Sequence, residues 1–275
     1  MKKLISGIFL IAVLFTLSAS SYALDFIKFG TGHDSDFWGT PDVAFGTFPS
    51  TVQYLAARGK NEITSIDLTD QNVEDVFSGA LGPFDAIVVS EGIQTLSPSS
   101  YALFQQYVLS GGCFILTGSH GSEDDFLNNA FGFSTSIVFL SDGVDTFSIQ
   151  PDAAETSFAG GPAALIAANA SVAFINNPGL NLYTGALGTA VFTDTFGKGN
   201  ISALGWDYCC TPPNDENAIL AWYEVVNRAF DQCSGEVVTL ARPIPTLSEW
   251  GLISMTGILG IVGLFAALRR RKATA

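Results

Sequence analysis

Hydrophobic and polar residues alternate along the first half of the chain in a way that predicts strands followed by helices. Strand-like stretches are DFIKFGTGH at 25–33, EITSIDLT at 62–69, FDAIVVSEG at 84–92 and CFILTGS at 113–119. Each of these strands is followed by one helix-like stretch, at 49–60, 70–81, 97–112 and 122–133 respectively. Residues 86–89 are apolar on both faces, which is typical of a buried strand in a parallel sheet.

Helix-capping residues support these helices. Asp70 is placed to cap the second helix, and Ser97 is followed by Pro98 at the first helical position of the third. Ser122 precedes three acidic residues, which suit the first turn of the fourth helix because the helix dipole favours negative charge there. Four strand-then-helix units in a row predict a doubly wound, mostly parallel sheet.

After Phe133 the pattern becomes rich in strands. The stretches 134–150, 171–177 and 189–207 read as strands, and a hairpin turn is predicted at residues 197–199. Residues 214–233 form an amphipathic pattern that predicts a final helix, capped by Asn214 or Asp215. The predicted fold class is therefore α/β, a doubly wound and mostly parallel sheet with a β-rich second half, within an exported domain at 24–234.

The first 23 residues have the layout of a secretory signal peptide. Lys2 and Lys3 precede an apolar stretch at 4–17, and small residues lead to Ala23. We expect cleavage after Ala23.

An uncharged stretch near the other end is long enough to cross a membrane. Residues 251–268 form a run of 18 residues, near the lower limit for about 30 Å of hydrocarbon. Four cations follow at Arg269, Arg270, Arg271 and Lys272, and the positive-inside rule keeps them in the cytoplasm. Both ends thus predict a body outside the inner membrane, joined to the span through a linker at 235–243.

The segment before this span resembles the IPTL-CTERM sorting signal, a relative of the PEP-CTERM signals of Gram-negative bacteria. The residues that carry the resemblance are Ile244, Pro245, Thr246, Leu247, Trp250 and Gly251. The resemblance implies that an exosortase, a membrane-embedded cysteine protease-transpeptidase, recognises residues 244–275. It further implies release or attachment at the cell surface, where extracellular polysaccharide is a candidate partner.

The acidic charge of the body limits which partners it is expected to bind. Between the hydrophobic ends lie 26 acidic residues and 6 basic ones, a net charge of about −20. Such a body repels nucleic acid and anionic lipid, so we expect neither as a partner. The charge favours solubility, and a calcium role is the alternative.

Four cysteines in an exported chain predict disulfide bonding. Cys209 or Cys210 is a candidate to pair with Cys233, whereas Cys113 begins an apolar strand and is expected to be buried. The connectivity cannot be read from the spacing. A zinc site at the cysteines is not favoured, because the thiols lack zinc-ligand spacing, and the sequence commits to no metal or cofactor.

The body also resembles the class I glutamine amidotransferase-like superfamily, in its flavodoxin-like sense. The resemblance rests on the stretches 84–89, 107–118 and 197–207. It implies a fold and, by itself, no activity.

Four residues that could carry chemistry follow predicted strand ends. These are His33, Glu91, Ser119 and His120, and they are expected on one rim of the sheet. Ser119 stands where the superfamily's enzymes carry a nucleophilic cysteine, but Trp206 and Asp207 stand roughly where the late histidine base would be. A serine hydrolase, a metal site that adds Asp34 and Asp36, and a plain turn with a helix cap all remain open.

The sequence therefore favours an exported, exosortase-sorted surface protein with a non-catalytic structural or interaction role. Two alternatives are a serine-type hydrolase or amidotransferase-like enzyme acting on surface glycans or amides, and a calcium- or sugar-binding module.

Overall fold

The computed structural model describes most of the predicted exported body. The described residues are 23–30, 38–39, 49–90, 95–118, 121–141, 143–168, 171–208 and 216–234. The chain divides into two compact units, Met1–Val237 and Val238–Ala275, and all described residues belong to the first. Residues 1–22, the linker at 235–243 and the predicted membrane span at 251–268 lie outside the described residues. Within the described ranges, no helix is long and apolar enough to cross a membrane.

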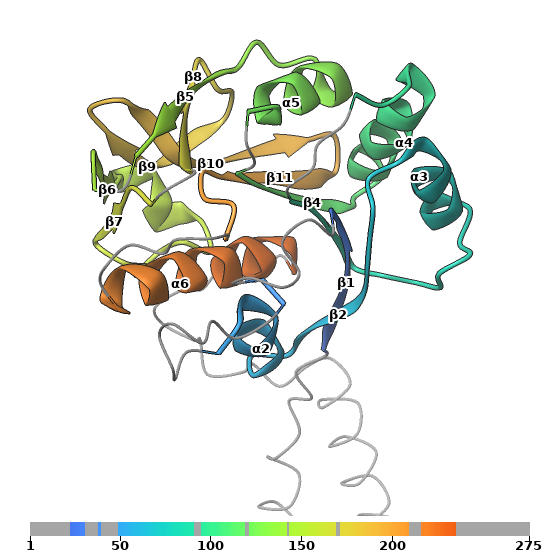
Figure 1. Cartoon of the computed structure of the whole chain (residues 1–275), viewed down its shortest axis with the longest axis horizontal. Helices are drawn as coiled ribbons and strands as arrows, with labels where there is room; N and C mark the ends of the chain where they lie inside the picture. Colours follow the sequence, from blue (N-terminus) through green and yellow to red (C-terminus); the bar gives the residue numbers. More distant parts are fainter. Residues whose placement is uncertain are drawn as a thin grey trace, which may run out of the picture. The chain divides into compact units, whose positions relative to one another are not determined.

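The strands and helices of the first half lie where the hydrophobic pattern predicts them (Figure 1). The strands are β1 (Leu24–Phe29), β2 (Lys60–Ile66), β3 (Ala86–Val89) and β4 (Cys113–Thr117). The helices are α2 (Thr51–Ala56), α3 (Asp70–Phe77), α4 (Pro98–Leu109) and α5 (Glu123–Phe131). These four strands lie parallel in the order β2-β1-β3-β4.

The second half supplies seven further strands, one 3-10 helix and the last α-helix. In chain order these are β5 (Ser136–Leu140), β6 (Thr146–Ile149), η1 (Pro151–Glu155), β7 (Ala164–Ile166), β8 (Ser171–Ile175), β9 (Leu180–Gly185), β10 (Gly188–Phe196), β11 (Gly199–Leu204) and α6 (Glu216–Cys233). The hairpin predicted at residues 197–199 is confirmed, because Phe196 pairs with Gly199 where β10 turns into β11. Strands β7 and β9 and the helix η1 have no counterpart in the sequence-based prediction.

The predicted doubly wound, mostly parallel sheet is wrong. All eleven described strands form one mixed sheet, whose main path is β2-β1-β3-β4-β11-β10-β9-β6-β7. Four strand pairs are parallel and six are antiparallel. Part of the cause is the absence of a helix among the described residues between β8 and β11: β9, β10 and β11 join by short turns without a crossover helix and therefore run antiparallel.

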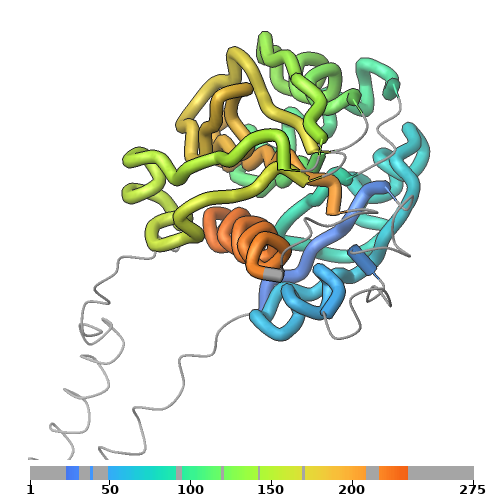
Figure 2. Tube along the Cα trace, turned by 60° about the vertical axis from the view of Figure 1, so that its left-hand side comes forward, coloured from blue at the N-terminus to red at the C-terminus, as the bar shows by residue number. Residues whose placement is uncertain are grey.

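Alternate residues of the strands enter two separate cores. On one face, Phe26 and Ile115 pack with α2 and α6. On the other face, Ile27 and Phe114 pack with α3, α4 and α5. Figure 2 shows α6, in orange, running beside the blue helix α2. Burial on both faces explains why β3, and β4 up to Leu116, are continuously apolar.

The predicted caps are partly confirmed. Ser97 is the N-cap of α4, and its side chain accepts a hydrogen bond from the backbone of Ser100, with Pro98 in the first turn. The N-cap of α3 is Thr69 rather than Asp70. Asp70 has a different role, because its carboxylate accepts hydrogen bonds from Ser97 and from the Ser100 hydroxyl at 2.6 Å, which ties α3 to α4. Ser122 is the N-cap residue of α5 but makes no side-chain cap hydrogen bond.

Candidate functional site

The four predicted rim residues, His33, Glu91, Ser119 and His120, lie outside the described residues, as do Asp34 and Asp36. That the four residues share one rim of the sheet therefore stays a prediction. The structure does describe the strand ends that precede them, namely the ends of β1, β3 and β4. Within the described part of the chain, no group of three or more histidine, cysteine, aspartate or glutamate side chains could hold a metal ion.

At the ends of β1 and β3, polar side chains bind backbone carbonyls. The ammonium of Lys28, 1% exposed, donates to the carbonyl of Gly30 and lies 5.7 Å from the ring centroid of Trp38. The Ser90 hydroxyl lies 3.2 Å from the carbonyl oxygen of Phe29 and 3.3 Å from that of Gly30. These groups close the ends of neighbouring strands, because a buried polar group needs a partner. The sequence signal for Lys28 was a single cation inside an apolar strand.

The ends of β4 and β11 are in direct backbone contact. The amide of Gly118 donates to the carbonyl of Trp206 at 3.0 Å. A Cβ atom at Gly118 would lie 2.8 Å from the carbonyl oxygen of Gly205, so only glycine fits this approach. Ser119 therefore follows a residue whose backbone is fixed against the end of β11.

The amidotransferase-like resemblance expected Trp206 and Asp207 roughly where a histidine base would be. Both are buried, with Trp206 fully covered and Asp207 1% exposed. The ring of Trp206 lies 4.6 Å from that of Tyr208 and 6.0 Å from that of Trp222, measured between centroids. These contacts place Trp206 in the aromatic core beneath α6, where it has a packing role.

Tyr208 fastens this aromatic core to α6. Its hydroxyl donates to the carbonyl of Trp222 at 2.9 Å, and its backbone is left-handed with φ of 60°. Burial raises the pKa of Tyr208 well above its ordinary value, with smaller contributions from Tyr223 and Tyr54. The hydroxyl therefore stays protonated and keeps donating across the physiological range.

The stretch SDGVDT at 141–146, which lacks the full spacing of a calcium loop, has a structural role through Asp145. Its carboxylate accepts hydrogen bonds from the amides of Thr146 at 2.8 Å, Leu187 at 2.9 Å and Ala186 at 3.3 Å. Three backbone donors on one carboxylate hold the turn between β9 and β10 against the loop that precedes β6.

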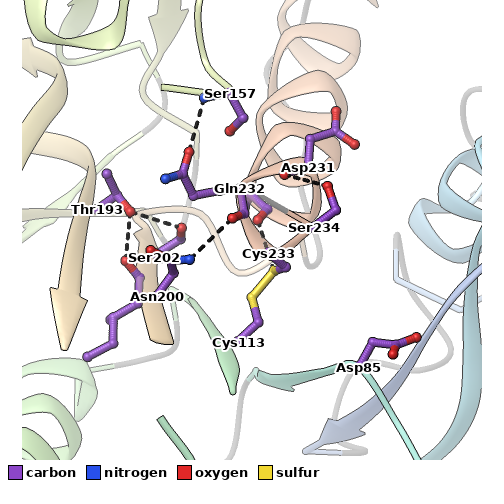
Figure 3. Close-up of a disulfide and its surroundings, with 12 residues drawn as sticks. Asp85, Cys113, Ser157, Thr193, Asn200, Ser202, Asp231, Gln232, Cys233 and Ser234 are labelled. Carbon is purple, nitrogen blue, oxygen red and sulfur yellow. Dashed lines mark hydrogen bonds between the residues drawn. A yellow bond between two sulfur atoms is a disulfide. The ribbon is translucent and has the colours of Figure 1, made fainter. Parts of the chain in front are cut away.

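The last turn of α6 is the place where the body leads into the sorting tail, and a disulfide fixes it. Cys233 bonds to Cys113 across 120 residues, with the two Cα atoms 5.2 Å apart (Figure 3). This differs from the predicted partner of Cys233, which was Cys209 or Cys210, and it gives Cys113 a bond where only burial was expected. Cys209 and Cys210 lie outside the described residues. The difference arises because β4 passes beneath the end of α6, a tertiary relation that cysteine spacing does not encode.

Hydrogen bonds reinforce the same end of the helix. The side-chain amide of Asn200, in β11, donates to the carbonyl of Gln232 at 3.3 Å. The Gln232 side chain accepts in turn from the amide of Ser157 at 3.0 Å (Figure 3). The ammonium of Lys60, in β2, binds Asn227 at 2.8 Å and Asp231 at 2.7 Å.

Arg228 adds the segment after η1 to this set of contacts. Its guanidinium donates to the carbonyls of Ser157 at 2.8 Å and Ala159 at 2.7 Å, and pairs with Glu224 at 2.8 Å. We call the contacts of Lys60, Asn200, Arg228, Gln232 and the Cys113–Cys233 disulfide the α6 clamp. Through it the final helix is bound to β2, β4, β11 and the segment after η1.

Comparison with solved structures shows a known fold for the body. The mmIFT52 N-terminal domain matches with a TM-score of 0.52 and 9% identity, over 78% of this chain and 99% of that domain. A thua-like protein from Parabacteroides merdae has a TM-score of 0.49 and 13% identity over 82% of this chain and 94% of its own. A cytoplasmic protein from Salmonella typhimurium has a TM-score of 0.48 and 10% identity over 76% and 98%.

The identities are low enough that the likeness to the mmIFT52 domain concerns the fold alone. The amidotransferase-like resemblance of the body is not confirmed by these structures. No curated protein sequence matches the chain.

The tail gives a more specific match. Residues 242–271 match the IPTL-CTERM motif, which confirms the sorting signal predicted from Ile244 to Gly251. The chain therefore carries a signal that is recognised by an exosortase and that implies export and sorting to the cell surface.

Proposed function

We propose that this chain is a cell-surface protein whose body has a non-catalytic structural or interaction role in the envelope or extracellular matrix. The signal peptide at 1–23 directs export, and the span at 251–268 holds the chain in the inner membrane until the exosortase acts. The IPTL-CTERM match at 242–271 carries the cell-surface part of this proposal, because it specifies a route to the surface.

The Cys113–Cys233 disulfide supports export independently of the tail. Structural disulfides form and persist in the periplasm and outside the cell and are rare in the cytosol. The bond closes a loop of 120 residues that contains most of the body. Its contribution to the stability of the body is therefore available only in an oxidising compartment.

The described side chains at the strand ends have structural roles, which agrees with the proposed structural body. Lys28 and Ser90 are committed to backbone carbonyls, and Trp206 belongs to the aromatic core. A catalytic rim needs polar groups directed at a substrate, whereas these side chains hold strand ends together.

The α6 clamp gives the proposal a physical link between body and tail. The chain leaves the body after a helix end that is bound covalently to β4 and by hydrogen bonds to β11 and to the segment after η1. The described body therefore extends to Ser234, and residues 235–241 separate it in sequence from the matched motif.

A reporter fusion tests the sorting half of the proposal. Residues 242–275 are joined to an exported reporter and expressed in a host with an exosortase and in its exosortase-deficient mutant. We expect a shortened reporter at the cell surface or in the medium only in the first host. Replacement of Ile244–Leu247 by alanines in the fusion should abolish processing. In the full chain, Val238→Ala changes a residue outside the motif and should leave processing intact. Equal processing in both hosts would remove sorting as the function of the tail.

A further inference from the structure

The described sheet has three strands that pair on one side only: β2, β7 and β5. Proteins protect such edges with charge, proline or shortness, because an open edge pairs readily with another strand. Strand β2 carries Lys60 and Glu62, and β7 is three residues long. Strand β5, with the sequence SIVFL, has five residues and neither charge nor proline. It is the unprotected edge of the three.

Strand β5 also exposes apolar side chains on both of its faces. Phe139 is 56% exposed and its neighbour Val138 is 38% exposed. Successive residues of a strand point to opposite faces, so the exposed apolar surface wraps around this edge. In Figure 1 the strand lies at the margin of the sheet beside β8. The Phe139 ring also lies against the backbone of Gly121, where an added Cβ would come within 2.4 Å of it.

The chain segments that form β5 and its partner β8 contain no charged residue, although the body is strongly acidic and the first turn of the adjacent helix α5 carries Glu123, Asp124 and Asp125. Neither 132–141, which contains β5, nor 171–180, which contains β8, has a single charged residue, while residues 24–250 carry about −20. A second copy carries the same net charge, and its repulsion is weakest where both surfaces are neutral, since screening limits repulsion to about 8 Å at physiological salt.

We propose that two copies of this chain pair β5 against β5 in an antiparallel arrangement and so continue the sheet across a twofold axis. Antiparallel pairing of a strand with its own copy is self-complementary, as a twofold interface requires. It satisfies the open edge of both strands and covers Val138 and Phe139 together. This inference does not depend on the sorting function, because it rests on the body alone.

Sedimentation of the full-length chain in detergent micelles tests the pairing. We expect a reversible dimer whose association strengthens when salt is raised, because salt screens the repulsion between the two acidic bodies. Val138→Lys places like charges across the interface and should weaken association by about tenfold or more. Leu81→Lys, at a residue equally exposed (38%) in the turn after α3, is the matched control and should leave association unchanged. The wild type, Val138→Lys and Leu81→Lys all keep the tail, so association through the tail would not differ among them.

A covalent test reports the register directly. Paired antiparallel strands bring opposing Cα atoms to about 4.5–5.5 Å, within the range of a disulfide. Val138→Cys should therefore give a disulfide-linked dimer under oxidising conditions, and Leu81→Cys should not. A monomer at all concentrations, or equal association of the wild type and Val138→Lys, would overturn the proposal. Weaker association at high salt would instead indicate an electrostatic contact and would also overturn it.

Discussion

The disulfide between Cys113 and Cys233 joins the first residue of β4 to the last residue of α6. Strand β4 lies between β3 and β11 in the parallel part of the sheet, so the bond connects the end of the body with its interior.

Removal of this disulfide should lower the stability of the body. The double variant Cys113→Ala/Cys233→Ala frees a loop of 120 residues in the unfolded chain, and the expected loss in the free energy of unfolding is about 2–5 kcal/mol. Urea denaturation measures it. Reductant should lower the wild-type stability by a similar amount and leave the variant almost unchanged. Peptide mapping that linked Cys233 to Cys209 or Cys210 would contradict the assignment.

Arg228 should contribute more to stability than an exposed arginine. Arg228→Met leaves the carbonyls of Ser157 and Ala159 without their charged donor, and hydrogen bonds to charged groups contribute about 1.5–3 kcal/mol. Arg58→Met is the control, because Arg58 is exposed and also donates to a backbone carbonyl, that of Tyr54 at 3.1 Å, while stacking 3.5 Å from the Tyr54 ring centroid. We expect a loss of about 1 kcal/mol or less for the control. Equal losses in urea denaturation would show that the α6 clamp does not depend on Arg228.

The stabilising effect of Asp70 should vanish in acid. Hydrogen bonds from the Ser100 hydroxyl, and then from Ser97, lower the pKa of Asp70 below its ordinary value of 3.8. A carboxylate with a lowered folded-state pKa stabilises the fold above the unfolded-state pKa, and the effect is lost as pH falls through the folded-state pKa. The melting temperature of Asp70→Asn should therefore lie below that of the wild type at pH 7 and approach it below about pH 3.8. The exposed Glu155→Gln is the control for removing a surface carboxylate, and a difference for Asp70→Asn that persisted at low pH would contradict this role.

The non-catalytic reading of the body predicts an unreactive Ser119. A serine-directed fluorophosphonate probe should label the wild type and Ser119→Ala to the same low extent. Labelling of the wild type that disappears in Ser119→Ala would instead establish a nucleophile and favour the hydrolase. Ser90→Ala is a useful companion, since Ser90 is bound to the carbonyls of Phe29 and Gly30 and should not react either.

The sequence predicted local structure better than topology. The positions of β1–β4, α3–α6 and the β10–β11 turn follow from hydrophobic period, caps and glycines, which act over a few residues. The parallel fold class failed because the direction of β9 and β10 is set by their hairpin connection and pairing, which a single strand pattern does not reveal. Strand β9 begins with exposed residues and β7 has three residues, so neither gives a strong alternating signal.

Contacts between residues distant in the sequence also could not be predicted for the disulfide and for the polar side chains at the strand ends. The pairing of Cys113 with Cys233 and the contacts of Lys28 with Gly30 and Trp38 depend on which strand ends meet in space. The sorting tail was predictable from sequence because its recognition depends on a contiguous segment, which matches as residues 242–271.

The fate of the full-length chain in its host tests the central claim most directly. Mass spectrometry of the protein from cytosol, membrane and cell surface identifies its first and last residues in hosts with and without the exosortase. We predict a surface form that begins at Leu24 and lacks the residues after the motif, and, without the exosortase, an accumulated membrane form that keeps them. Recovery of an intact chain from the cytosol, with residues 1–23 still attached and Cys113 and Cys233 reduced, would contradict the account.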